Sequence, residues 1–160
     1  MIKKYIDESE IIFILENLRE EDKQELIALY GDNWFYRTLQ DLKYRKFYIL
    51  YGYDYELNVV PIAMGGFCEC FESDKSVVCC WLLSSVYIYK NKILFFKSLK
   101  EQMKDAENKY KIMYNFIHKT NFSAKKWLKN LGFKFDNPNP KNITVKDGFE
   151  FFYKLCKKGN

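Results

Sequence analysis

The sequence is poor in the residues that usually mark linkers and boundaries between domains. It has 3 prolines and 7 glycines among 160 residues, and neither type is concentrated in one stretch. No segment is of low complexity, and no repeat recurs at solenoid or propeller periods. With 48% hydrophobic and 19% aromatic residues, the chain can build one sizeable core but not two. We therefore expect a single domain over residues 1–160.

Long apolar runs are also missing. The first residues include Lys3, Lys4 and Asp7, so they resemble neither a signal peptide nor a transit peptide. The longest apolar stretch, Val77 to Tyr89, is too short for a membrane helix and contains two serines. We expect this stretch to be a buried strand, and the protein to be cytosolic and away from membranes.

The chain has no block of charge of one sign. Its net charge of +5 comes from lysines along the whole sequence. The densest basic segments, Lys125 to Lys129 and Lys157 to Lys158, are expected on a solvated helix face and in a tail. This distribution argues against nucleic acid as a partner. It favours a basic groove that binds a phosphorylated ligand.

The five cysteines are an odd number without a secretory signal, which predicts reduced thiols. If Ser73 to Lys75 forms a hairpin turn, Cys68 and Cys70 lie opposite Cys79 and Cys80. Adjacent residues of a strand point to opposite faces, so four thiolates would not converge on one zinc ion. We predict cysteines packed in the core and no metal site.

Three helices are predicted before the first long strand. The first follows Ser9, expected as its capping residue, and carries an apolar stripe of Ile11, Ile12, Ile14, Leu15 and Leu18. The second opens at Arg19 to Asp22, stops at Gly31, and is expected to bury Leu26, Ile27, Leu29 and Tyr30. The third covers Trp34 to Lys43.

A three-stranded meander should follow. Lys46 to Tyr53, Val59 to Phe71 and Lys75 to Ser85 alternate and are rich in β-branched and aromatic residues. Pro61 and the Gly65–Gly66 pair interrupt the second strand. Such residues predict a bulge or a close backbone approach there.

The second half alternates between helices and strands. A long amphipathic helix starts at Asn91, with Ile93, Phe96, Leu99, Met103 and Ala106 at helical spacing. The later elements are a strand at Lys111 to His118, a helix at Ser123 to Leu131, a short strand at Phe133 to Asp136, a loop at Pro138 to Asn142, and a last strand at Phe149 to Cys156. This order predicts an α/β fold whose mixed central sheet is flanked by helices.

One segment in this order has a specific pattern, Asn121-x-x-Ala124-x-x-Trp127-Leu128-x-x-Leu131-Gly132-Phe133. Placed directly after a strand, it resembles the GNAT family of N-acetyltransferases. In that family the segment is the helix beside the acyl-CoA groove, and its Gly-Phe corner leads into the next strand. Gly132 suits a left-handed helix exit, and Phe133 would fill the core.

The chain is also similar to the short GNAT-like proteins of tailed bacteriophages, a group that includes an internal virion protein. This likeness rests on Leu18 to Leu26, Pro61 to Gly66 and Cys80 to Leu83. The GNAT resemblance implies that acetyl-CoA donates an acyl group to an amine acceptor. The implied cofactor contacts are Trp81, Leu82, Leu83, Ser84, Lys90, Lys92, Asn121 and Ala124.

Two features depart from the family pattern. GNAT enzymes hold the CoA pyrophosphate in a loop of the form Gln/Arg-x-x-Gly-x-Gly/Ala, whereas Val86 to Lys92 contains no glycine. The tyrosine that protonates the leaving thiolate in many members is replaced by Leu128. Candidate bases are Glu69, Glu72 and His118, although glutamates in such a place are more often solvent-facing strand residues and a lone histidine more often caps a strand.

Two functions therefore remain open. The protein is either an N-acyltransferase or a catalytically inactive GNAT-fold protein that binds a phage or host protein, or a second copy of itself, in the cytosol or packaged in a virion. The enzyme requires the strands at Trp81 to Ser85 and Lys111 to His118 to separate into a V that Tyr87 and Tyr89 do not fill. If the aromatic run from Phe149 to Tyr153 were exposed, it would mark a partner surface.

Overall fold

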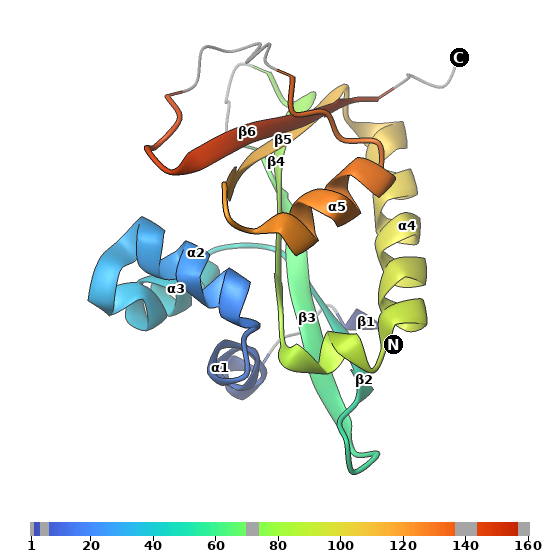
Figure 1. Cartoon of the computed structure of the whole chain (residues 1–160). Helices are drawn as coiled ribbons and strands as arrows, with labels where there is room; N and C mark the ends of the chain where they lie inside the picture. The colour runs from blue at the N-terminus through green and yellow to red at the C-terminus, as the bar shows by residue number, and fades with distance from the viewer. Residues whose placement is uncertain (1, 4–6, 70–73, 137–143, 157–160) are drawn as a thin grey trace.

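A computed structural model describes residues 2–3, 7–69, 74–136 and 144–156. Its six-stranded sheet has three helices against one face and two against the other (Figure 1). The strands are β1 (Ile2–Lys3), β2 (Tyr48–Tyr53), β3 (Val59–Cys68), β4 (Val77–Ser84), β5 (Ile112–His118) and β6 (Phe149–Leu155). The helices are α1 (Glu8–Glu16), α2 (Glu20–Tyr30), α3 (Trp34–Leu42), α4 (Lys92–Lys109) and α5 (Phe122–Asn130), with 3₁₀ turns η1 (Gly31–Asn33) and η2 (Val86–Tyr89). The predicted α/β architecture with a mixed sheet is confirmed.

The strands lie in sequence order, from β1 at one edge to β6 at the other. All neighbours are antiparallel except β4 and β5, which are parallel. The parallel pair follows from α4, because a helical crossover returns the chain to the end of the sheet where β4 began. Helices α1, α2 and α3 cover one face, and α4 and α5 cover the other (Figure 1). No helix in these described ranges is long and apolar enough to cross a membrane.

The first helices follow the sequence pattern with two corrections. Asp7, not Ser9, caps α1, because its side chain accepts the Ser9 amide while Glu10 accepts the Asp7 amide in a capping box. In α2, Leu26 is buried as predicted, but Leu29 and Tyr30 are 40% and 36% exposed. These two residues line a cavity, described below, and so are not sealed in the core.

The interruption predicted in β3 is a bulge. Leu50 of β2 pairs with Ala63 and Tyr51 pairs with Pro61, which leaves Ile62 as the extra residue. A close approach accompanies it, because a Cβ atom on Gly66 would lie 2.9 Å from the Lys46 carbonyl oxygen.

The far edge of the sheet differs from the prediction. Phe133 to Asp136 does not form a strand, since only Lys134 exchanges backbone hydrogen bonds with Tyr153, at 2.8 and 3.0 Å. Gly132 has φ +84°, as the predicted left-handed exit of α5 requires. In β6, the aromatic run is buried and therefore offers no exposed apolar surface; its members are Phe149, Phe151, Phe152 and Tyr153. The predicted loop from Pro138 to Asn142, together with Cys70, Glu72 and Ser73, lies outside the described residues.

Asn91 fixes the start of α4 against the sheet. Its Oδ1 accepts the Tyr53 amide at 3.0 Å, and its Nδ2 donates to the carbonyls of Tyr53 and Tyr87 at 2.8 and 2.9 Å. The neighbouring Gly52 makes room for this side chain, because a Cβ atom at Gly52 would lie 2.6 Å from Asn91 Oδ1. The buried amide of Asn91 thus joins β2, η2 and α4.

We predict that Gly52→Ala lowers the free energy of unfolding by about 1 to 3 kcal/mol, because the methyl group displaces the Asn91 side chain. Asn91→Ala alone should cost about 2 kcal/mol by leaving the Tyr53 backbone groups unpaired. The double variant should lose clearly less stability than the two single losses added together, since the clash with Asn91 disappears with its side chain and only the contact at 2.8 Å from Ile62 Cδ1 remains. Urea unfolding of the three variants tests this, and strict additivity would contradict the proposed contact.

Candidate active site at a split in the sheet

The parallel pair β4 and β5 is joined only at its beginning. Val77, Val78 and Cys79 pair with Ile112, Met113 and Tyr114, and no later residues of the two strands pair. At the next position a side-chain hydrogen bond takes the place of the backbone hydrogen bond between the strands, because Asn115 Nδ2 donates to the Cys80 carbonyl at 2.8 Å. Beyond this bond the strands diverge. The V required for a GNAT enzyme is therefore present.

The divergence leaves backbone groups of β4 without a neighbouring strand. Alternate residues of a strand direct their N–H and C=O groups to the same side, so Cys80, Leu82 and Ser84 all face the split. Ser84 is satisfied at the far end, where its amide donates to Asp22 Oδ2 at 3.0 Å and its carbonyl accepts the Arg19 amide at 3.1 Å. Leu82, midway between Cys80 and Ser84, thus directs its amide toward the open part of the V.

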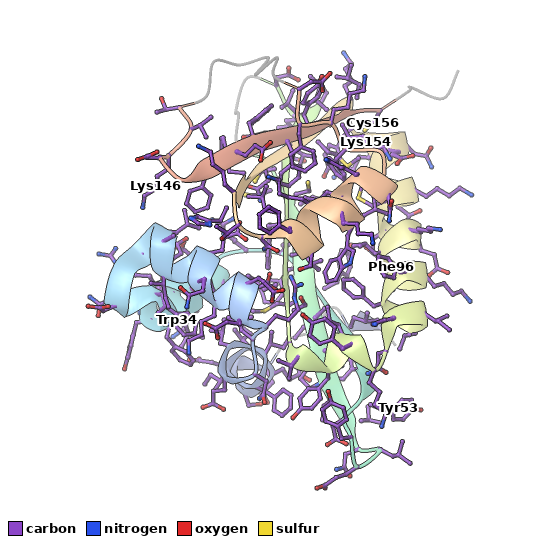
Figure 2. The ribbon with its side chains drawn as sticks, viewed as in Figure 1. Trp34, Tyr53, Phe96, Lys146, Lys154 and Cys156 are labelled. Atoms are coloured by element: carbon purple, nitrogen blue, oxygen red, sulfur yellow. The ribbon has the colours of Figure 1, made fainter. Side chains whose placement is uncertain are left out.

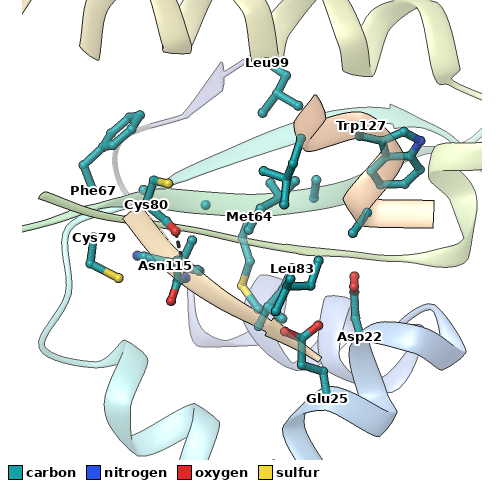
Figure 3. A pocket seen from close by; sticks show the side chains of 18 of the residues that line it. Asp22, Glu25, Met64, Phe67, Cys79, Cys80, Leu83, Leu99, Asn115 and Trp127 are labelled. Carbon is teal, nitrogen blue, oxygen red and sulfur yellow. Dashed lines mark hydrogen bonds between the residues drawn. The ribbon is translucent and has the colours of Figure 1, made fainter. Parts of the chain in front are cut away.

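A cavity of about 410 Å³ occupies the split and reaches both faces of the sheet. Figure 3 shows Leu99 and Trp127 on one side of the strands and Asp22 and Glu25 on the other, with the Asn115 to Cys80 bond between them. The cavity is therefore a passage through the sheet rather than a pocket on one face.

Charge is distributed unequally between the two ends of this passage. All charged side chains that line it belong to α2, α3 or the residues beside them: Arg19, Asp22, Glu25, Asp41 and Arg45. The lining from α4 and α5 is uncharged: Phe95, Ser98, Leu99, Gln102, Met103, Ala124, Trp127 and Leu128. Cys80 also lines the cavity, and burial raises the pKa of its thiol to about 12, so the thiol is neutral. In the described part of the chain, one end is charged and the other apolar.

Glu25 is one of three carboxyl groups at the charged end. Its Oε1 accepts the His118 amide at 3.1 Å, and its Oε2 accepts Asn121 Nδ2 at 2.9 Å. Burial raises the pKa of Glu25 to about 7, an effect that the hydrogen bond from Asn121 opposes and the nearby Asp22 reinforces. A carboxylate with this pKa exchanges a proton near neutral pH, as a general base must.

Arg19 joins the two arms of the V at its wide end. This 2% exposed residue donates from Nε to Ser84 Oγ at 2.8 Å and from Nη1 to Ser123 Oγ at 3.1 Å. Its Nη2 pairs with Asp22 at 2.5 Å, and its guanidinium carbon lies 4.4 Å from the centre of the Trp127 ring. One buried cation thus connects β4 with α5, while Asp22 balances its charge.

Five of the eight residues implied as cofactor contacts line the cavity: Trp81, Leu82, Leu83, Asn121 and Ala124. Ser84 is fully buried beside it and engaged by Arg19 and Asp22. The two lysines lie elsewhere. Lys90 donates to the Asp54 carbonyl at 2.6 Å, and Lys92 is exposed at the start of α4.

The candidate bases from the sequence are not in the cavity. Glu69 lies 3.7 Å from Lys109 at the surface, and Glu72 is outside the described residues. The His118 imidazole contacts Thr120 Oγ1 at 2.8 Å and packs against Phe149, and only the backbone amide of His118 reaches Glu25. Sequence reasoning missed Glu25 because it is one of several acidic residues on α2, and its partners are 93 and 96 residues away.

The glycine-free loop between β4 and α4 has most of its own amides engaged, while the first amides of α4 have no side-chain cap. The amides of Val86, Ile88, Lys90 and Asn91 donate to protein carbonyls. Tyr87 packs against Phe13, Tyr89 is exposed, and neither tyrosine lines the cavity. The tyrosines therefore leave the V open, but the loop presents few free donors for a pyrophosphate.

Trp127 packs against α4 at the apolar end of the cavity. Its ring centre lies 5.5 Å from that of Phe95 and 5.8 Å from that of Phe96. Phe96 is directed from α4 toward α5 (Figure 2). The three rings bridge the two helices, and two of them, Phe95 and Trp127, line the apolar end.

Comparison with known proteins identifies the fold. No family model and no curated protein sequence matches the chain. Among solved structures, it resembles an acetyltransferase of the GNAT family from Staphylococcus aureus Mu50 (15% identity, TM-score 0.65, 98% and 99% of the two chains). It also resembles a ribosomal-protein-alanine N-acetyltransferase from Brucella melitensis (18%, 0.62, 97% and 99%) and yncA from Salmonella typhimurium, solved with acetyl-CoA (15%, 0.57, 100% and 95%). The chain has the GNAT fold.

We predict that Glu25 makes stability depend on pH. Its pKa is about 7 in the folded protein and near 4.5 as a free side chain, so the folded state binds more protons between these values. The free energy of unfolding should therefore fall as the pH rises from about 4.5 to 7, by about 1 to 3 kcal/mol.

In the Glu25→Gln variant the free energy of unfolding should change little between pH 4.5 and 7, because Gln does not titrate. This holds whether the variant is more or less stable than the wild type. Urea unfolding of both proteins at several pH values tests the slope, with the exposed Glu20→Gln as the matched control. A wild-type profile parallel to that of Glu25→Gln would contradict the shifted pKa.

Proposed function

We propose that this protein is an N-acyltransferase that moves an acyl group from a thioester to an amine inside the passage through its sheet. The observation that carries the proposal is the split between β4 and β5, filled by a cavity with Glu25 at its charged end. The fold shared with GNAT acetyltransferases supports the same reaction class. We propose a thioester such as acetyl-CoA as donor, because the apolar end suits an uncharged acyl group.

The amine acceptor enters from the side of α2 and α3. Glu25 and Asp41 favour a cationic amine there, and the apolar walls lower its pKa by disfavouring the charged form. A free alkylamine has a pKa near 10.4, so it must lose a proton before it attacks. That proton passes to solvent as the amine enters, and Glu25 is positioned to accept the second proton, which the nitrogen releases after it has attacked.

The transfer forms one C–N bond and breaks one C–S bond. The neutral amine nitrogen attacks the thioester carbon, the C–N bond forms, and the carbonyl oxygen becomes an oxyanion. The Leu82 amide, directed into the V, is the proposed donor to that oxyanion. The C–S bond then breaks, the carbonyl re-forms, and the amine proton passes to Glu25.

No side chain is assigned to protonate the leaving thiolate. Leu128 stands where many GNAT enzymes have a tyrosine, and it lines the cavity as an apolar residue. A thiol has a pKa near 8.5, so a thiolate departs readily near neutral pH and takes its proton from solvent. The missing tyrosine should slow the reaction without preventing it.

A second candidate is a GNAT-fold binding protein without catalysis. It is favoured by the loop before α4, whose amides are mostly occupied by protein carbonyls. The likeness to phage proteins belongs to this alternative, with the host cytosol or the virion as location and a phage or host protein or a second copy as partner. Titration with acetyl-CoA separates the two candidates: saturable binding and amide formation support the enzyme, and no binding at millimolar concentration supports the second.

We predict that Glu25→Gln lowers kcat/KM about a hundredfold or more, since positioned bases contribute roughly 10² to 10⁴. In the wild type, kcat/KM should rise with pH through about 7, as Glu25 loses its proton. The measurement is thiol release with a panel of primary amines. Glu20→Gln, on the same helix and exposed, should keep the wild-type profile; an unchanged rate in Glu25→Gln would remove Glu25 from the reaction.

We also predict a weak contribution from the nucleotide part of the donor. Because the loop amides are engaged, acetyl-pantetheine should react with a KM within roughly tenfold of that for acetyl-CoA, a difference of about 1.4 kcal/mol or less. Competition assays with both thioesters measure this ratio. A preference for acetyl-CoA of a thousandfold would show that the loop does hold the phosphates.

A further inference from the structure

The charged end of the passage has a second group of charged side chains, which lies at a distance from Glu25. Tyr30 of α2 donates from its hydroxyl to Asp41 Oδ2 of α3 at 2.8 Å, and Arg45 follows shortly after the end of α3. Asp41 and Arg45 line the same cavity as Glu25. Glu25 and Tyr30 are separated by about 7.5 Å along the axis of α2, at 1.5 Å for each residue. This side of the sheet therefore carries charge at two separate places.

The second place carries more positive than negative charge. Burial raises the pKa of Tyr30, as does its bond to Asp41, whereas the charges of Arg45 and Arg37 lower it, so both guanidinium groups lie near the same hydroxyl group. No carboxylate of the described residues forms an ion pair with either arginine. Two cations therefore accompany one anion, and Arg45, which lines the cavity, is available to bind a further anion.

Apolar side chains line the cavity on the side of the sheet that carries both places. Leu29 of α2 follows Glu25 by one helical turn, and Phe116 lines the cavity from β5. Phe116 packs in one apolar cluster with Cys79, and Cys79 lies on the same side of the strands as Glu25 (Figure 3). A molecule that contacts Glu25 at one end and Arg45 at the other should therefore be uncharged in its middle.

We infer that the preferred acceptor is an amino carboxylate, with its amine at Glu25 and its carboxylate paired with Arg45. This inference rests on the proposed function and names its acceptor; the products are the N-acylated amino acid and the free thiol. A guanidinium group binds a carboxylate through two parallel hydrogen bonds and with opposite charge. Because Glu25 and Tyr30 are about 7.5 Å apart along α2, the two groups of the acceptor should be separated by roughly 7 Å or more. An α-amino acid is too short, whereas an ω-amino acid of roughly six to eight carbons spans this distance.

The test measures thiol release from acetyl-CoA with the full chain and a series of amines. The acids are γ-aminobutyrate, ε-aminocaproate and ω-aminocaprylate, and each is compared with its neutral amide. For the two longer acids, kcat/KM should exceed that of the amide roughly fivefold or more, through a lower KM, and the shorter acid should gain less. Equal values for acids and amides at every length would overturn the inference while leaving the acyltransferase proposal in place. Absence of thiol release with every amine would instead contradict the proposed function itself.

Arg45→Gln should bring the KM of ε-aminocaproate to that of its amide, because the carboxylate loses its partner. Arg37→Gln is the matched control, since Arg37 is also exposed but does not line the cavity, and it should keep most of the preference for the acid. Arg45→Lys should keep part of the preference, because an ammonium group retains the charge without the paired hydrogen bonds. Arg45 is exposed, so these substitutions should leave the fold intact. An Arg45→Gln variant that prefers the acid as strongly as the wild type does would overturn the inference.

Discussion

The structure depends on the point where β4 and β5 stop pairing. Three residue pairs hold the strands together, and each strand must then find other partners for its backbone groups on the side of the gap. Asn115 supplies the first, by donating from its side chain to Cys80. The strands can diverge there because a side chain closes the ladder at the apex.

The wide end of the V is stabilised by a buried ion pair. Arg19 and Asp22 are almost inaccessible to water, and together they bind the backbone and hydroxyl of Ser84 and the hydroxyl of Ser123. Burying two charges is costly unless they are paired and their other hydrogen-bonding groups are satisfied, as they are here. This arrangement holds α2 and α5 at fixed places beside the gap, which brings Glu25 to Asn121 and to the end of β5.

The division of charge follows from which helices cover each face. Helices α2 and α3 bring carboxylates and arginines to one end of the passage, whereas α4 and α5 bring leucine, phenylalanine and tryptophan to the other. Glu25 is buried at the charged end, and this burial raises its pKa to about 7. A thioester and an amine have opposite requirements for polarity, and the two ends of the passage meet them separately.

The sequence by itself determined the order and type of the elements, because those depend on local periodicity, capping and turn chemistry. The exit at Gly132 and the bulge near Pro61 were readable. The stripe of α4 was right for Met103 and Ala106 but wrong for Ile93, which is 88% exposed because it lies at the first turn beyond the sheet contact made by Phe95. Phe133 to Asp136 did not form a strand, since among these residues only Lys134 exchanges backbone hydrogen bonds with β6, at Tyr153. Only the tertiary structure decided that Glu25 faces the cavity, that Lys90 turns toward Asp54 and that Arg19 is buried. The physical reason is that burial and long-range hydrogen bonds, not local pattern, set the chemistry of a side chain, and the partners of Glu25 and Arg19 are far from them along the chain.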